Sequence, residues 1–227
     1  MEFNPQGEAS DSLRVFVENN GEICYDLFIR YIRRGIMENK ALLKPVYIVI
    51  SQTGTILSRI LKLITHKSYN HVSISLADDL HIMYSFGRKT PYNPFKGGFV
   101  KESAEFGTFK RFTNTKVIVI KTMIPYEKYE ELVALVDFMT INTFNYKYNY
   151  VGLCLAAFKI RFSSKNRYYC SEFVREILIK HNVNGADKLK KIVHPMSFLS
   201  LPEIQMVYCG KLKDFSCENR KQLNNVV

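Results

Sequence analysis

Cys170 stands at the start of a predicted helix, a position that suits a nucleophile. The apolar residues after it fall at i+3, i+4, i+7 and i+8, which predicts a helix with the cysteine in its first turn on the buried face: Phe173, Val174, Ile177 and Leu178. The first amides of a helix lack intrahelical partners and lie at the positive end of its dipole, so they stabilise a thiolate and can hold an oxyanion. Because cysteine is also among the most buried residue types, Cys170 counts as a nucleophile only with a base beside it.

His71 is the candidate base. It follows the polar loop 66–70 and opens the stretch 71–76, in which polar residues alternate with apolar ones. This alternation predicts a half-buried strand. An imidazole at the start of such a strand can face an adjoining helix start and accept a thiol proton. A lone histidine on a strand is usually a structural residue, so the hypothesis depends on the two motifs together.

The elements that must position these two residues predict an α+β fold. Apolar residues at helical spacing predict helices at 22–39, 56–64 and 125–139, one after 151, and one from 170. Runs that are rich in β-formers or that alternate predict strands at 46–50, 71–76, 80–86, 116–121 and 204–208. Between them, 90–112 is rich in glycine, proline and aromatic residues and predicts an elaborated loop, with at most a short strand at 98–101.

Three stretches carry a resemblance to a known family: the strand, loop and helix at 47–64, the histidine strand at 70–74, and the cysteine helix start at 169–174. In these the chain resembles the YiiX/YebB-like permuted relatives of the NlpC-type papain-fold hydrolases. Unpermuted relatives place the cysteine helix before the histidine strand, whereas here the histidine comes 99 residues earlier. Geometry and not chain order defines a catalytic group, so the permuted order is no objection.

The resemblance implies a circularly permuted papain-like core, in which an antiparallel sheet packs against helices. It implies a catalytic domain at 44–210. The arm with an extra helix at 1–43 and the C-terminal tail at 211–227 lie outside the resemblance, which does not explain the helix. In this core Cys170 would attack a carbonyl while His71 takes its proton, and water would hydrolyse the resulting acyl-thioester.

The resemblance also implies two further site residues. One is a tyrosine near the thiol, for which Tyr148 is the closest fit, although a packing role is equally open to it. The other is a polar residue on the strand after the histidine strand, which would orient the imidazole. Tyr84 fits that third position best, while Ser85 is polar but short and His81 lies nearer the turn. None of these three is a carboxylate, so the activation of His71 is expected to be weaker or differently arranged.

Cysteine usage and hydropathy bound the setting. The five cysteines are odd in number and scattered without a CxxC pair, which argues against a disulfide framework and a zinc site and favours a reducing, cytoplasmic location. No secretory signal is visible, and no apolar run approaches the roughly 20 residues that span a bilayer. His66 and His71 have no third clustered ligand, and Gly97-Gly98 is no phosphate-binding loop. We therefore predict neither a metal nor a cofactor.

The charge distribution points to anionic partners. Lysine and arginine number 32 against 21 acidic residues, a net charge of +11. Between Lys147 and Lys191 there are 10 basic and 3 acidic residues, so most of the excess lies there. Such a field favours an anionic membrane surface or an acidic polymer, and no motif indicates nucleic acid. A merely solubilising surface is the simpler alternative.

Three functions remain open at this level. The first is a cysteine amidase or peptidase acting on a peptide or other amide. The second is a hydrolase or acyltransferase that uses the same nucleophile on a lipid ester or thioester. The third is a non-catalytic binding module that kept the fold while its third catalytic position drifted to Tyr84.

Overall fold

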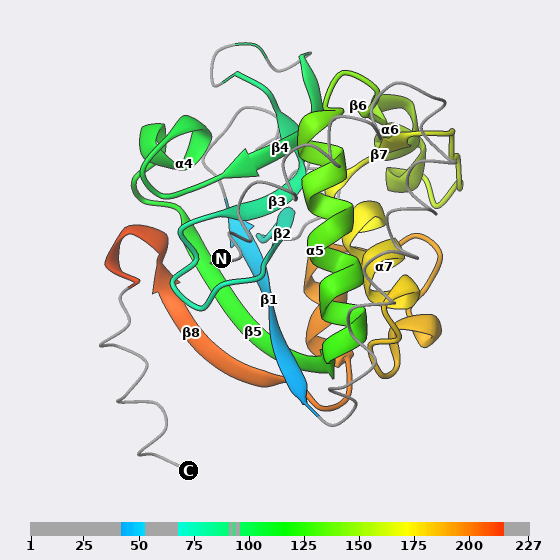
Figure 1. Cartoon of the computed structure of the whole chain (residues 1–227). Helices are drawn as coiled ribbons and strands as arrows, with labels where there is room; N and C mark the ends of the chain where they lie inside the picture. Colours follow the sequence, from blue (N-terminus) through cyan, green and yellow to red (C-terminus); the bar gives the residue numbers. More distant parts are fainter. Residues whose placement is uncertain (1–41, 53–67, 91–92, 94–95, 216–227) are drawn as a thin grey trace, which may run out of the picture.

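One sheet of eight strands organises the protein, seen in a computed structural model that describes residues 42–52, 68–90, 93 and 96–215 (Figure 1). The strand order is β7-β6-β4-β3-β2-β1-β5-β8, and neighbours run antiparallel except β6 and β7. The strands are β1 (Leu43–Gln52), β2 (His71–Ser75), β3 (Met83–Arg88), β4 (Gly97–Glu102), β5 (Lys116–Pro125), β6 (Lys147–Tyr148), β7 (Arg167–Tyr168) and β8 (Gln205–Lys211).

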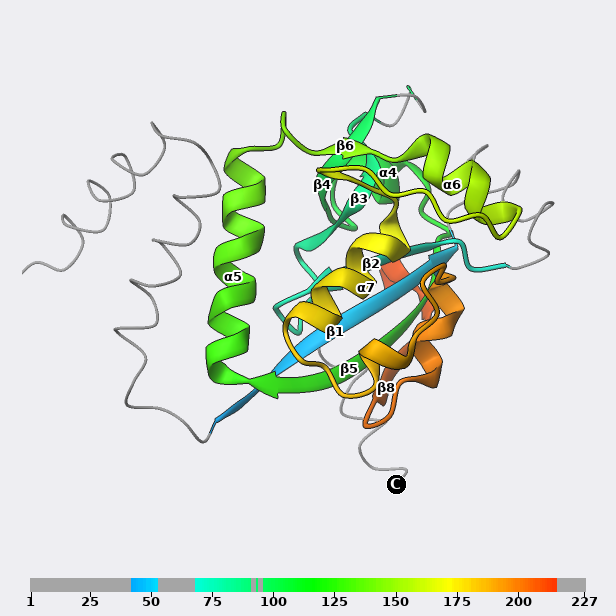
Figure 2. The same ribbon diagram turned by 90° about the vertical axis from the view of Figure 1, so that its right-hand side faces the viewer.

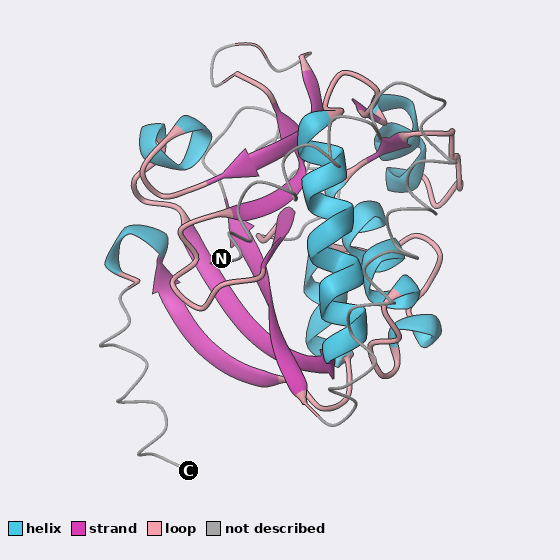
Figure 3. Ribbon diagram, in the orientation of Figure 1, coloured by secondary structure: helices cyan, strands magenta, loops and turns pink. Residues whose placement is uncertain are grey.

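Helices cover this sheet unequally (Figure 3). The α-helices are α4 (Gly107–Arg111), α5 (Tyr126–Ile141), α6 (Tyr150–Ala157) and α7 (Cys170–Lys180). Short 3₁₀ segments follow as η1 (Ala186–Lys188), η2 (Pro195–Ser200) and η3 (Leu212–Asp214). The larger helices α5 and α7 lie on one side of the sheet (Figures 1 and 2). The expected α+β class is therefore confirmed.

β1 and β5 form the longest strand pair of the sheet. Their ladder runs without a break from Leu43 opposite Pro125 to Gln52 opposite Lys116. β1 is apolar at every position from Val46 to Ile50, where both of its faces are buried. Val46, Ile48 and Ile50 belong to the main core with α5 and α7, whereas Tyr47 and Val49 belong to a smaller core on the opposite face.

Several elements begin or end at residues other than those that the sequence predicts. The predicted hairpin exists, but β3 begins at Met83 because Leu80 adopts a left-handed turn conformation at φ 55°. The predicted loop 90–112 contains all of β4, which extends the expected short strand to Glu102, and also the helix α4. The expected tail boundary at 211 falls at the end of β8, after which Leu212 is still buried in the smaller core. The predicted helices at 22–39 and 56–64 lie outside the described residues.

The starts of α6 and α7 are tied to each other. Asn149 caps α6 by accepting a hydrogen bond from the Gly152 amide at 2.8 Å. At the start of α7, the Glu172 carboxylate accepts a hydrogen bond from the Tyr169 amide at 3.4 Å, which supports the first turn as in a capping box. The Asn149 side-chain amide also lies 3.5 Å from that carboxylate. The first turn of the cysteine helix is thus anchored to the neighbouring helix.

No helix in the described ranges is long and apolar enough to cross a bilayer.

Replacing Asn149 by alanine should lower the free energy of unfolding by about 1 to 2 kcal/mol, because a buried helix cap is lost. Urea unfolding measures this change. Asn145→Ala is the matched control, since its exposed side chain should matter by less than about 0.5 kcal/mol. Equal stabilities of the two variants would show that the cap contributes nothing.

Candidate active site

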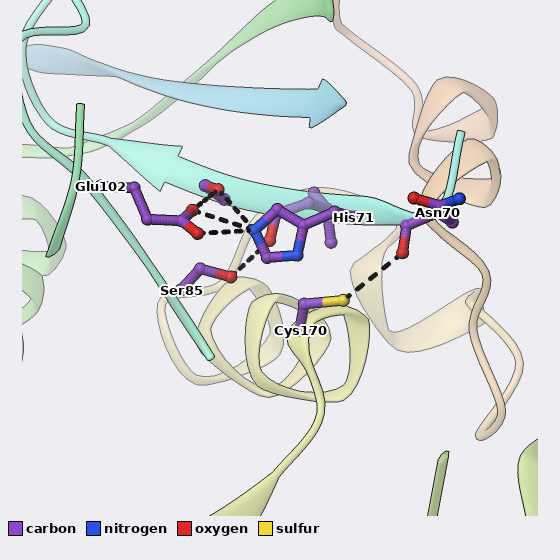
Figure 4. A network of polar contacts seen from close by, with 7 residues as sticks. Asn70, His71, Ser85, Glu102 and Cys170 are labelled. Atoms are coloured by element: carbon purple, nitrogen blue, oxygen red, sulfur yellow. Dashed lines mark hydrogen bonds and ion pairs between the residues drawn. The ribbon is translucent and has the colours of Figure 1, made fainter. Parts of the chain in front are cut away.

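His71 lies at the start of β2 and is held by a carboxylate that the sequence did not identify. Its Nε2–H donates to both oxygens of Glu102, at 3.0 Å to Oε1 and 2.9 Å to Oε2 (Figure 4). The Ser73 hydroxyl donates to Glu102 Oε2 at 2.6 Å and so fixes the carboxylate from a second side. The side chains of His71 and Glu102 are only 14% and 11% exposed, so water screens this pair weakly.

The contact between His71 and Glu102 spans an intervening strand. β3 lies between β2 and β4 in the sheet, so the two side chains come from strands two positions apart. Gly87 on β3 leaves them room to meet. A Cβ added at Gly87 would lie 3.2 Å from Glu102 Oε1 and 3.7 Å from His71 Cε1, and the first of these distances is tighter than ordinary packing allows. The glycine therefore forms part of the site.

Electrostatics favour the protonated form of His71. Burial alone would lower the pKa of the imidazole. The charge of Glu102 raises it, and so do the hydrogen bond to Cys170 and the charge of Cys170. Together these interactions outweigh burial and raise the pKa of His71 to about 10. Phe109 of α4 belongs to the smaller core, and its ring centroid lies 6.3 Å from that of the imidazole. The histidine is thus an imidazolium at neutral pH, with its orientation fixed by Glu102.

Cys170 is the first residue of α7 and meets the other side of the imidazole. The thiol lies 4.0 Å from the Asn70 carbonyl oxygen, immediately before the histidine, and is 4% exposed. Figure 4 shows ring nitrogen Nδ1 on the side of the imidazole that faces the sulfur, opposite Glu102. The two residues that the motifs singled out are therefore brought together.

Tyr148 also lies near the thiol, as the family resemblance implied. It belongs to β6 and is buried, at 7% exposure. Burial, followed by the charge at Cys170, raises the pKa of its hydroxyl well above the ordinary value. The hydroxyl therefore stays protonated and can donate a hydrogen bond.

The residues expected at the third position lie elsewhere. Tyr84 belongs to the main-core face of β3, where its ring stacks on Phe99 with centroids 6.2 Å apart. Ser85 donates its hydroxyl to the Val72 carbonyl at 2.7 Å, and His81 is exposed with Glu105 at 3.8 Å. The structure thus corrects the assignment of Tyr84, because Glu102 takes the place against the imidazole.

A signal for Glu102 was present in the sequence. Gly98, Val100 and Glu102 alternate along β4, so the carboxylate shares a face with two non-polar residues at the end of a strand. An acidic residue in such a position needs a partner. The strand expected at 98–101 ends one residue before Glu102. The residue that orients His71 is expected instead on β3, the strand next to the histidine strand.

A groove of about 120 Å³ opens beside the sulfur. α6 lines it with Leu153, Ala156 and Ala157, and the segment 192–195 lines it with Ile192 and Pro195 among others. The Ser171 hydroxyl donates to the Val193 carbonyl at 2.7 Å and holds that segment against the start of α7. Because most of the lining is apolar, the groove suits an apolar acyl group next to the thiol.

Within the described ranges, no three His, Cys, Asp or Glu side chains are grouped so as to hold a metal ion.

No family model, curated protein or solved structure matches this chain. The resemblance carried by the motifs around His71 and Cys170 therefore remains an expectation. Any function has to be inferred from the geometry of the site.

The stability of the protein should fall as pH rises through about 10. The pKa of His71 is raised above its ordinary 6.5, so its contribution is fully present below pH 6.5 and is lost as pH rises through the folded value of about 10. Glu102→Gln removes the charge that raises this pKa, so the variant should lose less stability than the wild type between pH 6.5 and pH 10.

Urea unfolding at both pH values measures this difference, and groups common to both proteins cancel in the comparison. Glu105→Gln is the control, because that exposed carboxylate faces only exposed His81 and should leave the profile unchanged. Parallel profiles for the wild type and Glu102→Gln would contradict the assigned pair.

Proposed function

We propose that this protein is a cysteine hydrolase of the amidase or peptidase kind, with Cys170 as nucleophile, His71 as acid and base, and Glu102 as the residue that orients the imidazole. The observation that carries the proposal is the imidazole of His71 held between the thiol and a buried carboxylate. This is the arrangement of nucleophile, base and orienting group that acyl transfer requires. We further infer that the sheet and helices form a permuted papain-like core, with a reducing cytoplasmic setting that keeps Cys170 a free thiol.

The chemistry follows from the positions of the groups. In the resting pair the proton shared by Sγ and Nδ1 of His71 lies on Nδ1, and the thiolate attacks the substrate carbonyl to form a carbon–sulfur bond. The oxygen then carries negative charge, which the first amides of α7 and the Tyr148 hydroxyl stabilise. As the carbon–nitrogen bond breaks, Nδ1–H protonates the leaving amine and an acyl-thioester remains. Water attacks this thioester and gives its proton to Nδ1 of His71, which releases the acid and restores the imidazolium beside the thiolate.

Glu102 supports both half-reactions without giving up a proton. Its hydrogen bonds at 2.9 and 3.0 Å hold Nε2 protonated, so Nδ1 is the nitrogen that exchanges a proton with sulfur. The binding-module alternative depended on a lost third residue. With Glu102 against the imidazole, that reason no longer applies.

A second candidate uses the same nucleophile on a lipid ester or thioester, as a hydrolase or acyltransferase. The observation in its favour is the apolar lining of the groove beside Cys170. Peptide substrates with an apolar acyl group fit the same groove, so both candidates share one mechanism and differ in the leaving group.

Cys170→Ala should abolish turnover of a panel of N-acyl aminomethylcoumarin amides and thioesters, because it removes the sulfur on which the proposed acyl intermediate forms. Fluorescence release by purified protein measures the rate. Cys154→Ala is the matched control, since Cys154 is also a free thiol but is exposed, and it should keep the wild-type rate. Equal activity of Cys170→Ala and wild type would refute the nucleophile.

Tyr148→Phe should lower kcat by roughly 10- to 100-fold while changing KM little, because its hydroxyl is assigned to the oxyanion that forms after binding. Steady-state kinetics separate the two constants. Tyr84→Phe is the control, since the Tyr84 ring stacks on Phe99 and the ionisable groups beside its hydroxyl are Asp137 and Tyr129 of α5, and it should keep kcat. An unchanged kcat in Tyr148→Phe would leave that tyrosine with a packing role only.

A further inference from the structure

The surface formed by α6 and the stretch after it is unusual in what it exposes. α6 has the sequence YVGLCLAA, which is apolar on all sides, yet Gly152 is its one buried residue. A helix that is apolar all round normally lies inside a protein or a membrane. Val151 and Cys154 of α6 are exposed, and so is every residue of the following stretch 158–163. We call α6 together with 158–163 the α6 surface.

Large apolar side chains concentrate on the α6 surface. Val151 is 57% exposed, Phe158 74%, Ile160 52% and Phe162 43%. Four large apolar residues on one short segment exceed the scattered single residues that an ordinary surface carries. Apolar side chains that are exposed to water raise the free energy of the protein. A partner with an apolar interior would lower it by covering them.

Basic residues interleave with these apolar ones. Lys159 and Arg161 alternate with Phe158, Ile160 and Phe162, and Lys165 and Arg167 follow. From 150 to 171 the sequence contains no acidic residue. Alternating cationic and apolar side chains match the boundary between anionic headgroups and acyl chains, because long basic side chains reach the headgroups while apolar ones enter the chain region.

The α6 surface is continuous with the site. Leu153, Ala156 and Ala157 of the same helix line the groove that ends at Cys170. On the opposite wall, exposed Lys190 and Lys191 lead into Ile192. A ligand that approaches over the α6 surface therefore reaches the thiol along an apolar wall.

We propose that the α6 surface docks on an anionic phospholipid bilayer and that an acyl substrate enters the groove directly from it. The docking step stands on the α6 surface alone, whereas the identity of the substrate rests on the proposed function. An RNA partner fits less well, because aliphatic Val151 and Ile160 offer no ring for base stacking. Basic side chains alone would bind the phosphates of RNA. The apolar side chains between them fit the acyl-chain region of a bilayer instead.

The test is co-sedimentation of the full chain with vesicles of phosphatidylcholine and phosphatidylserine, and with vesicles of phosphatidylcholine alone. Cys170→Ala protein is used so that no turnover alters the lipid. We expect binding to the anionic vesicles that weakens with added salt, and binding to phosphatidylcholine vesicles weaker by roughly tenfold or more. No binding to anionic vesicles, or equal binding to both kinds, overturns the proposal.

A triple variant, Phe158→Ser with Ile160→Ser and Phe162→Ser, should lose binding to anionic vesicles by roughly tenfold or more. The matched control is Met123→Ser with Met206→Ser, exposed apolar residues on β5 and β8 at the opposite end of the sheet from α6, which should bind like the parent. Thermal unfolding checks that both variants fold, and Phe158→Ser alone takes the place of the triple variant if it does not. Unchanged binding by the folded serine variant overturns the proposal, as does tighter binding to a single-stranded RNA than to anionic vesicles.

The two proposals fail separately. Wild-type protein that hydrolyses soluble amides but ignores vesicles contradicts the docking surface and leaves the hydrolase intact. Cys170→Ala protein that binds vesicles, beside a wild type without turnover, contradicts the hydrolase and leaves the docking surface intact.

Discussion

The carboxylate of Glu102 reaches the imidazole of His71 across a strand that lies between them, and this contact constrains the rest of the site. It requires the order β4-β3-β2 and a register that places both side chains on one face, and Gly87 between them leaves room for the carboxylate. Removing one partner of this largely buried ionic pair is costly, because the other charge is left unpaired. The sheet therefore specifies the protonation and orientation of the histidine before any substrate binds.

The cysteine is brought to this histidine by helix packing and not by the sheet. α7 lies on the main-core side and starts where β2 starts, so that Cys170 lies beside Asn70. The capping contacts of Glu172 and Asn149 fix where the helix begins. A chain in permuted order can build this site because the contact depends on where the elements meet and not on which is made first.

Local patterns were enough to predict the two central residues and not the third. Cys170 and His71 each mark the start of an element whose periodicity is visible in the sequence, so their surroundings follow from residues a few positions away. Glu102 depends on the pairing of three strands, which no local pattern encodes, and Tyr84 was chosen because β3 is the next strand along the chain. α4 was missed for a related reason, since five residues are too few for a helical period and Phe109 is held by the smaller core.

The central claim is that Cys170 forms a covalent acyl intermediate with His71 and Glu102 behind it, and trapping that intermediate tests it most directly. Wild-type protein is mixed with a fast-acylating thioester, quenched in acid within the first turnovers, digested and examined by mass spectrometry. The account predicts one acyl group on the peptide that contains Cys170, and much slower formation of this adduct in Glu102→Gln. An acyl group that appears equally on exposed Cys154 or Cys209, at a rate that Glu102→Gln does not change, would contradict it.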